Sequence, residues 1–363
     1  MDNQGVDNNI LVIGNGFDLA HGLPTTYDNF ICAIRSKLQI PNFHNKKLHV
    51  EEVSLDYSYS KIKENGFVEY FLNYVGKVPG WVDMERLIKD IIAYFESFFS
   101  DSQNKIDLTG TINLTYENLS AIDLLDKRLK DCVLLFPLFD QKKRTYGCLK
   151  KKYYTEEFGL NKREVIKLLR SQLNEVIELL RLYLQNYCYD KQKDRLRAKK
   201  QILDIHPSYV ISFNYTDTYK VYGIKTEDVF HVHGNLEKDN MVLGFDDDEP
   251  ENLDFIYFKK YFQRIQKLTG YIDESKFEKT YISLDENDDI KAEKPLVHFY
   301  GHSMDKTDGD IIKTLRKMSG GFVIYKCSQE DYEQKVVNLI DVFGKKDAMD
   351  MIEKGFIKFE NCK

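Results

Sequence analysis

The stretch ILVIGNGFDLAHGLPTTYDNF, residues 10–30, decides the fold class because it joins an apolar strand to a glycine-containing turn. Its first four residues, Ile10–Ile13, form the continuous apolar run that is typical of a strand buried on both faces of a parallel sheet. A Gly-Asn-Gly turn at 14–16 ends the strand, and Asp18 is expected to cap a short helix after it. The stretch therefore predicts a strand and turn of an α/β sheet.

The bulk composition excludes several classes of protein. The chain has 363 residues, which indicates one large domain with insertions or two domains, and its net charge of -6 argues against nucleic-acid binding as the main role. The six cysteines include no Cys-x-x-Cys pair, so we expect neither a zinc site nor a disulfide framework. The polar, acidic opening residues and the lack of a long apolar stretch predict no signal peptide, no membrane helix and a cytoplasmic location.

The order of the predicted elements indicates a sheet that is interrupted by helices. One helix is predicted to begin at Asp83 and a second to pass through Leu169 and Leu184, whereas 101–118 and 140–160 are interpreted as connections. Short β-branched and aromatic strands are predicted at 209–213, 229–233, 241–245, 296–300 and 321–325, with helices over 304–318 and 332–343.

We therefore predict an α/β fold with a Rossmann-like, open, mainly parallel sheet and a large helical insertion after the first strand. Residues 1–24 would form the first strand and turn, 25–205 the mainly helical insertion, and 206–363 the remainder of the core with a C-terminal helix.

Unusual motifs lie at the carboxyl ends of four predicted strands, where open α/β sheets bind their ligands. The first is the turn at 14–16, whose small residues would let a ligand approach the backbone and whose N–H groups could face a phosphate. The dinucleotide fingerprint is incomplete because Leu19 stands at the third glycine position, and no Gly-Lys-Ser/Thr follows. A tight turn that needs glycine explains the motif equally well.

Two further motifs contain polar residues that could act on a ligand. Asn214 ends one strand, with Asp217 shortly after it, although both are also ordinary turn formers. His231 and His233 are two residues apart and would face the same side of a strand, with His233 the more exposed. A histidine there could be a general base or a hydrogen-bonded structural residue, and the lack of a third ligand argues against a metal.

The fourth motif is YGHSMDKTDGD, residues 300–310. Gly301 and Ser303 could contact a phosphate or a ribose hydroxyl. A helix N-cap formed by Ser303 or Asp305 is at least as good an explanation.

Together these motifs resemble the bacteriophage abortive infection family AbiH. The stretches that carry the resemblance lie in one order along nearly the whole chain: NILVIGNGFDLAHGLPTTYDNF (9–30), WVDMERL (81–87), ISFNYTDTY (211–219), HVHGNL (231–236), VLGFDD (242–247) and FYGHSMDKTDGDII (299–312). The family implies a bacterial protein of anti-phage defence, in which an infected cell is shut down before progeny emerge.

A more distant resemblance is to sirtuins and sirtuin-like defence NADases. The matching stretches, in order, are Gly14-Asn15-Gly16, Phe213-Asn214, His233-Gly234 and Gly301-His302-Ser303. The first turn reads Gly-Asn-Gly-Phe-Asp instead of the sirtuin Gly-Ala-Gly, and the four-cysteine zinc module is missing. The resemblance therefore implies an NAD-cleaving core without a metal, and not a protein deacylase.

This second resemblance also implies a role for each matching residue. Asn214 would orient the nicotinamide ribose or the attacking water, and His233 would be the general base. The residues implied to bind NAD are Gly14, Asn15 and Gly16 along the pyrophosphate, Asp18 and Asp217 at ribose hydroxyls, and Ser303 near the adenosine half. Phe17, Gly234 and Gly301 are also expected to contact NAD.

Three functions stay open at this point. The first is an NAD-hydrolysing defence effector, and the second is a nucleotide-sensing module that signals through the helical insertion without catalysis. The third, a nuclease-type toxin, is disfavoured by the negative net charge and the missing metal ligands. A toxic NADase must be held inactive, so besides the dinucleotide we expect a phage trigger and a homo-oligomer as partners.

Overall fold

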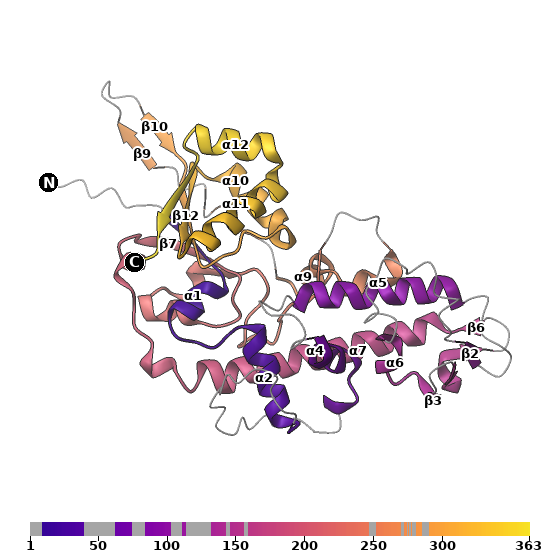
Figure 1. Cartoon of the computed structure of the whole chain (residues 1–363). Coiled ribbons are helices and arrows are strands. Elements are labelled where there is room, and N and C mark those ends of the chain that lie inside the picture. Colours follow the sequence, from indigo (N-terminus) through magenta and orange to yellow (C-terminus); the bar gives the residue numbers. More distant parts are fainter. Residues whose placement is uncertain are drawn as a thin grey trace.

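The structure is a computed structural model, which describes residues 9–39, 62–74, 84–102, 111–113, 132–142, 146–155, 159–246, 252–269, 272, 273, 275, 277, 281–284 and 290–363. A six-stranded sheet forms the core of one half of the molecule (Figure 1). Its strands are β1 (Asn9–Ile13), β7 (Pro207–Ser212), β8 (Val229–His231), β11 (Leu296–Tyr300), β12 (Gly321–Lys326) and β13 (Ile357–Asn361). They are parallel and lie in the order β13-β12-β11-β1-β7-β8.

This strand order confirms the predicted fold class. β1 is central, because it pairs with β7 on one side and with β11 on the other. The strands that follow in sequence add outward from β7 on one side and from β11 on the other, which is the order of a doubly wound, Rossmann-like sheet. The carboxyl ends of β1 and β11 therefore meet where the direction of winding reverses.

Both faces of the sheet are covered, as the continuous apolar run in β1 predicts. Ile10 and Val12 pack on one face, against helices α10 (Gly309–Met318), α11 (Gln329–Phe343) and α12 (Lys345–Glu353). Leu11 and Ile13 point to the opposite face. Helices α1 (Asn15–Ala20) and α8 (Lys200–Leu203) pack there, together with the 3-10 helix η6 (Thr218–Tyr222).

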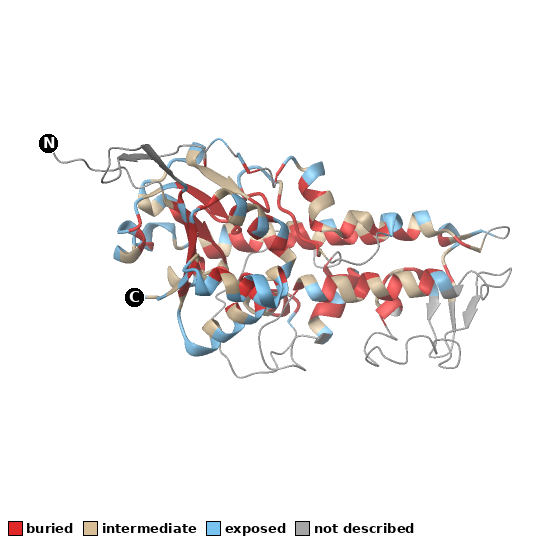
Figure 2. Cartoon of the chain, turned by 90° about the horizontal axis from the view of Figure 1, so that it is seen from above, coloured by how far each residue is buried: buried red, intermediate tan, exposed pale blue. Residues whose placement is uncertain are grey.

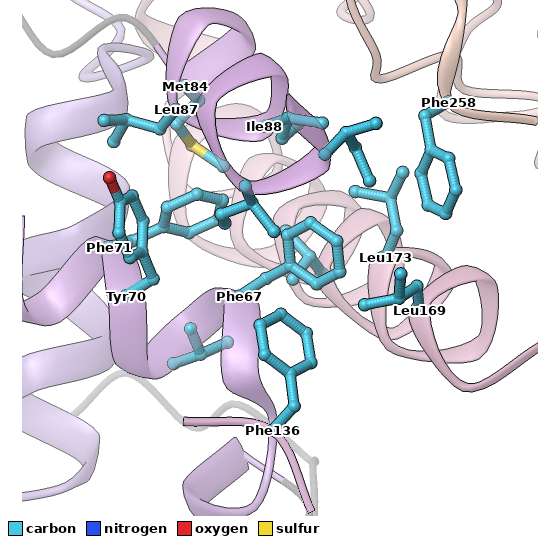
Figure 3. Packing of buried hydrophobic residues seen from close by; sticks show 14 of the residues in the cluster. Phe67, Tyr70, Phe71, Met84, Leu87, Ile88, Phe136, Leu169, Leu173 and Phe258 are labelled. Atoms are coloured by element: carbon cyan, nitrogen blue, oxygen red, sulfur yellow. The ribbon is translucent and has the colours of Figure 1, made fainter. Parts of the chain in front are cut away.

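Most of the helices between β1 and β7 build a second hydrophobic core that extends away from the sheet (Figures 1 and 2). They are α2 (Tyr27–Lys37), α4 (Gly66–Tyr74), α5 (Met84–Ser102), α6 (Cys132–Leu135) and α7 (Lys162–Leu182), which continues as the π-helix η4 (Tyr183–Tyr189). Aromatic side chains fill the space between them. Phe136, for example, packs edge-on against Phe67 (Figure 3). It also packs edge-on against Phe95. The predicted division at 24/25 and 205/206 stays a prediction.

Short elements complete the described chain. The small strands are β2 (Thr111–Asn113), β3 (Phe139–Lys142), β4 (Tyr146–Leu149), β5 (Tyr154–Thr155), β6 (Gly159–Leu160), β9 (Tyr281–Leu284) and β10 (Ile290–Glu293). The remaining helices are α9 (Lys260–Gln266) and the 3-10 turns η3 (Lys151–Tyr153), η5 (Lys193–Arg195), η7 (Thr226–Asp228), η8 (Leu253–Phe258) and η10 (Lys306–Asp308). No described helix is long and apolar enough to cross a membrane.

Several local predictions are wrong. The segment 241–245 is not a strand: it makes one isolated bridge, from Phe245 to Lys259, and its apolar side chains join the core of the helical insertion. The segments 101–118 and 140–160 contain short strands as well as connections. The helix after β1 begins at Asn15 with Gly14 as its N-cap residue, so Asp18 lies within the helix instead of capping it.

The chain end also differs from the prediction. Residues after 343 add α12 and the edge strand β13, which the sequence did not indicate. A disulfide joins Cys327, which follows β12, to Cys362, which follows β13, although no disulfide was expected. The predicted N-cap at Asp83 lies outside the described residues, but α5 is present directly after it.

Candidate functional site

The predicted site residues gather at one edge of the sheet because all six strands are parallel. The turns after β1, β7, β8 and β11 contain the four polar or glycine motifs, and these turns contact one another. Asn214, after β7, donates a hydrogen bond from its side-chain amide to the Gly14 carbonyl oxygen, after β1, at 2.9 Å. Phe213 contacts both His233, after β8, and His302, after β11. The edge is therefore one connected cluster of side chains.

The glycines of the first and fourth motifs pack against each other. The Gly16 N–H donates to the Gly301 carbonyl at 2.8 Å, and the Gly14 N–H donates to Tyr300 at 3.3 Å. A Cβ atom on Gly301 would lie 2.1 Å from the Phe17 nitrogen, and one on Gly14 would lie 2.7 Å from the Gly301 oxygen. Glycine is therefore required here for close backbone packing between the β1 and β11 turns.

Polar groups next to these glycines have local partners. Asn15 accepts a hydrogen bond from the Thr25 hydroxyl at 2.5 Å. The carbonyl of Ser303 accepts one from the Asn338 amide at 2.8 Å, which ties the β11 turn to α11. Asp305 caps the following helical turn by accepting from the Thr307 N–H, as one of the alternative interpretations predicts. The nucleotide contacts expected of Gly14, Asn15, Gly16, Phe17, Gly234, Gly301 and Ser303 stay predictions.

His233 forms a buried pair with a carboxylate that the sequence did not single out. Its Nε2 lies 3.0 Å from Asp308 Oδ1, and its Nδ1 has no hydrogen-bond partner among the described residues. Burial lowers the pKa of His233 despite the neighbouring carboxylate. A neutral ring that donates Nε2–H to Asp308 leaves a lone pair on Nδ1, which is the arrangement of a general base with an orienting carboxylate. The prediction that His233 is more exposed than His231 is wrong. His233 is buried, with 6% of its surface accessible, whereas His231 is half-buried.

Asp308 is the centre of this cluster. It also binds Lys260 Nζ at 3.1 Å, and His302 Nε2 lies 3.6 Å from its second oxygen. Burial opposes its ionisation, but Lys260 and His233 outweigh burial and hold the pKa of Asp308 well below its usual range. Because Asp308 stays ionised, it can fix the tautomer of His233 and stabilise a positive charge on that ring.

Lys260 connects this cluster to the helical insertion. Its ammonium group lies 2.7 Å from Glu85, in the first turn of α5, and only 1% of the side chain is exposed. Burial disfavours its charge, but the Asp308 and Glu85 carboxylates raise the pKa of Lys260 above its usual value. The chain Glu85–Lys260–Asp308–His233 therefore joins α5 to the carboxyl edge of the sheet through buried polar contacts.

A second polar cluster lies around the end of β7. Asp18 Oδ2 accepts from the Thr216 hydroxyl at 2.5 Å, and burial raises the pKa of Asp18 to about 6. Asp217 binds Lys220 at 2.7 Å and faces His231 Nε2 at 3.6 Å. His231 Nδ1 lies 3.1 Å from the carbonyl oxygen of Asn214. Both predicted ribose contacts, Asp18 and Asp217, therefore lie in buried positions, and Asp217 lies beside His231.

One comparison decides the family. The model of the family described as "Bacteriophage abortive infection AbiH" matches residues 10–321. The chain belongs to the AbiH family. No curated protein and no solved structure matches it, and the resemblance to sirtuins is not confirmed.

The AbiH match covers β1 through the start of β12, and so includes every residue of both polar clusters. Sequence reasoning missed four residues of the first cluster: Glu85, Lys260, His302 and Asp308. His302 and Asp308 follow β11, so the strand-end rule that selected Ser303 could have found them. Lys260 and Glu85 are at the start of helices far apart in sequence, and nothing local marks them as partners. No group of three or more His, Cys, Asp or Glu within the described ranges could hold a metal ion.

Proposed function

We propose that this AbiH-family protein acts in anti-phage defence by hydrolysing the bond between nicotinamide and ribose in NAD. The observation that carries the proposal is the His233–Asp308 pair, with a neutral imidazole whose Nδ1 has no partner among the described residues. It lies at the carboxyl edge of a doubly wound sheet, where this fold binds nucleotides.

In the proposed reaction, water attacks C1′ of the nicotinamide ribose while the C1′–N bond breaks. The electron pair of that bond leaves with nicotinamide, which becomes neutral. The water proton passes to Nδ1 of His233, and the ionised Asp308 stabilises the resulting imidazolium. The products are nicotinamide, ADP-ribose and one proton, which His233 later releases to solvent.

Asn214 supports this reaction as a positioning residue. Its side-chain amide is hydrogen-bonded to Gly14, so it holds the β1 turn against β7. The direct contact with ribose or water that the sequence predicts for Asn214 would use its amide oxygen, and it stays a prediction.

The experiment measures cellular NAD and plaque formation in bacteria that carry the intact chain, His233→Gln or His206→Gln. His206 is an exposed histidine after α8, so the same substitution there is the matched control. We expect infection to deplete NAD with the intact chain and the control, and a loss of about 10²- to 10⁴-fold in NAD-cleaving rate with His233→Gln. Protection against phage with unchanged NAD would refute NAD hydrolysis.

A second candidate function is a nucleotide sensor that signals through the helical insertion. It is favoured by the Lys260 link between Glu85 of α5 and Asp308 at the carboxyl edge. A sensor needs no general base, so His233→Gln would then leave phage protection intact and NAD unchanged. The same experiment therefore separates the two functions.

A further inference from the structure

Strand β13 forms one lateral edge of the six-stranded sheet and, among the described strands, pairs with β12 alone. The carbonyl of Phe356 accepts a hydrogen bond from β12 at 2.7 Å, and the N–H of Cys362 donates one to β12 at 2.9 Å. Backbone groups of successive residues in a strand point to opposite sides, so the even-numbered residues face β12. The backbone groups of Ile357, Phe359 and Asn361 therefore point away from the sheet.

Most of these outward groups have no partner in the part of the chain that the structure describes. The exception is the Asn361 carbonyl, which accepts from the Gln201 side chain at 2.8 Å. The opposite edge strand, β8, has only three residues, and its outward His231 carbonyl accepts from the Thr269 hydroxyl at 2.6 Å. Unpaired N–H and C=O groups on an edge strand are a template for another strand. β13 is therefore the edge at which this sheet can be extended.

The side chains of β13 indicate which strand would pair with it. Lys358 and Glu360 are exposed and two residues apart, so they lie on one face of the strand. If two copies of β13 pair antiparallel about a two-fold axis at Phe359, Lys358 of each copy lies opposite Glu360 of the other. The outward backbone groups match as well, because Phe359 then faces Phe359, and Ile357 faces Asn361, at hydrogen-bonded positions.

Charge disfavours the neighbouring symmetric registers. A slip of two residues keeps the outward groups facing each other, but it sets Lys358 opposite Lys358 or Glu360 opposite Glu360. Like charges directly opposite each other destabilise a strand pair, and opposite charges stabilise it. Charged side chains on an edge strand ordinarily hinder pairing. Here the two charges are opposite in sign and symmetric about Phe359, so they favour pairing with a second copy in one register.

Helix α12 would enlarge the contact beyond the strand. A stable interface buries about 800 Å² on each partner, and a pair of five-residue strands is short for that area. α12 packs against β13 and carries two exposed apolar side chains, Met349 and Ile352, which are 48% and 41% exposed. Pairing at β13 brings the α12 helices of the two copies toward the axis, where these side chains can be covered.

We propose that two copies of this chain form a two-fold dimer through β13, which joins their sheets into one. The sequence predicts a homo-oligomer without indicating a surface, and β13 supplies the surface, the strand and the register. The dimer does not depend on NAD hydrolysis.

The test measures the dimer dissociation constant of the full chain by analytical ultracentrifugation, from about 1 to 100 µM protein. Lys358→Glu replaces two attractive pairs across the axis with two repulsive ones, so the constant should rise about 10- to 100-fold. Adding Glu360→Lys restores both attractions with the signs exchanged, so the double variant should again dimerise like the intact chain. Lys225→Glu is the matched control, because its side chain is 73% exposed and precedes β8 at the opposite edge.

A pair of cysteine variants tests the register. Opposite residues at non-hydrogen-bonded positions of antiparallel strands have Cα atoms about 4.5 Å apart, within the range that a disulfide spans. An equimolar mixture of Lys358→Cys and Glu360→Cys should therefore form covalent dimers on mild oxidation. Either variant alone should form few, because its cysteine then lies opposite a residue without a thiol.

Each outcome decides the proposal. A chain that stays monomeric over this range, or a dimer that Lys358→Glu and Lys225→Glu leave equally tight, would overturn it. Covalent dimers from one cysteine variant alone, as abundant as those from the mixture, would overturn the register. Recovery of the dimer by the second charge change would support it and could not come from a folding defect of the first. None of these measurements reads NAD cleavage, so failure of the proposed function would leave the dimer intact.

Discussion

Replacing Lys260 with methionine should destabilise the protein far more than removing a surface ion pair. The ammonium group of Lys260 is 1% exposed and lies between Glu85 at 2.7 Å and Asp308 at 3.1 Å. Removing one partner of a buried ion pair costs about 3–5 kcal/mol, because the remaining charge stays buried without compensation. Here two carboxylates lose their common cation. Methionine has a similar length and flexibility, so the change removes charge with little loss of volume.

The assay is urea denaturation followed by circular dichroism, with Lys354→Met as the control. Lys354 pairs with Asp350 at 3.3 Å, but their side chains are 75% and 46% exposed. An exposed pair contributes about 0–1 kcal/mol, so the control should have almost the same midpoint as the intact chain. For a denaturant slope of about 3 kcal/mol per molar urea, Lys260→Met should lower the midpoint by about 1–2 M.

A double variant tests the cause of this loss. Adding Asp308→Asn to Lys260→Met removes one of the two uncompensated carboxylates, so it should recover part of the lost stability. Residues that share one ion-pair network are expected to couple in this way, and independent residues are not. A Lys260→Met midpoint equal to that of Lys354→Met, or strictly additive losses in the double variant, would refute the link between α5 and the carboxyl edge.

Three further outcomes follow from other contacts. Gly301→Ala should lower the free energy of unfolding, measured by urea denaturation, by at least about 3 kcal/mol, because its Cβ would lie 2.1 Å from the backbone nitrogen of Phe17. Gly355 has a similar backbone φ but open space around it, so Gly355→Ala should lower this free energy by only about 1 kcal/mol. Burial raises the pKa of Asp18 to about 6, so the folded chain binds this proton more tightly than the unfolded chain. The free energy of unfolding should therefore fall as pH rises from about 4 to about 6. Asp18→Asn should remove that decline when urea midpoints are compared across this range. Reducing the Cys327–Cys362 disulfide, which closes a loop with a sequence separation of 35, should lower the free energy of unfolding by about 3–4 kcal/mol. The reductant should leave the urea midpoint of Cys327→Ser unchanged.

The sheet could be predicted from sequence because its strands are buried on both faces. Continuous apolar runs identify β1, β7, β11 and β12, and parallel pairing then brings their following turns to one edge. The same criterion gave a false strand at 241–245, where the apolar side chains pack into the insertion core instead. A short apolar run indicates burial, but it does not distinguish a buried strand from a buried irregular segment.

The site was predictable only where its residues follow a strand. His233 and Asn214 could be selected in this way, but their partners depend on contacts between elements far apart in the chain. The closest side-chain contact of Lys260 is with Glu85, in another helix, and no spacing in the sequence encodes it. The exposure of His233 was misjudged for the same reason, since Asp308 and Phe213 contact it from two separate segments.

The glycine turn after β1 shows how one sequence pattern can have two physical causes. In a dinucleotide site, free N–H groups of such a turn face the phosphates. Here the N–H groups of Gly14, Gly16 and Phe17 already donate to backbone carbonyls, so these three groups are not free to bind a phosphate. The turn also presents the carboxylate of Asp18, which repels a phosphate but accepts from a hydroxyl. If NAD binds at this edge, we therefore expect a ribose to face the β1 turn and the pyrophosphate to lie farther from Asp18.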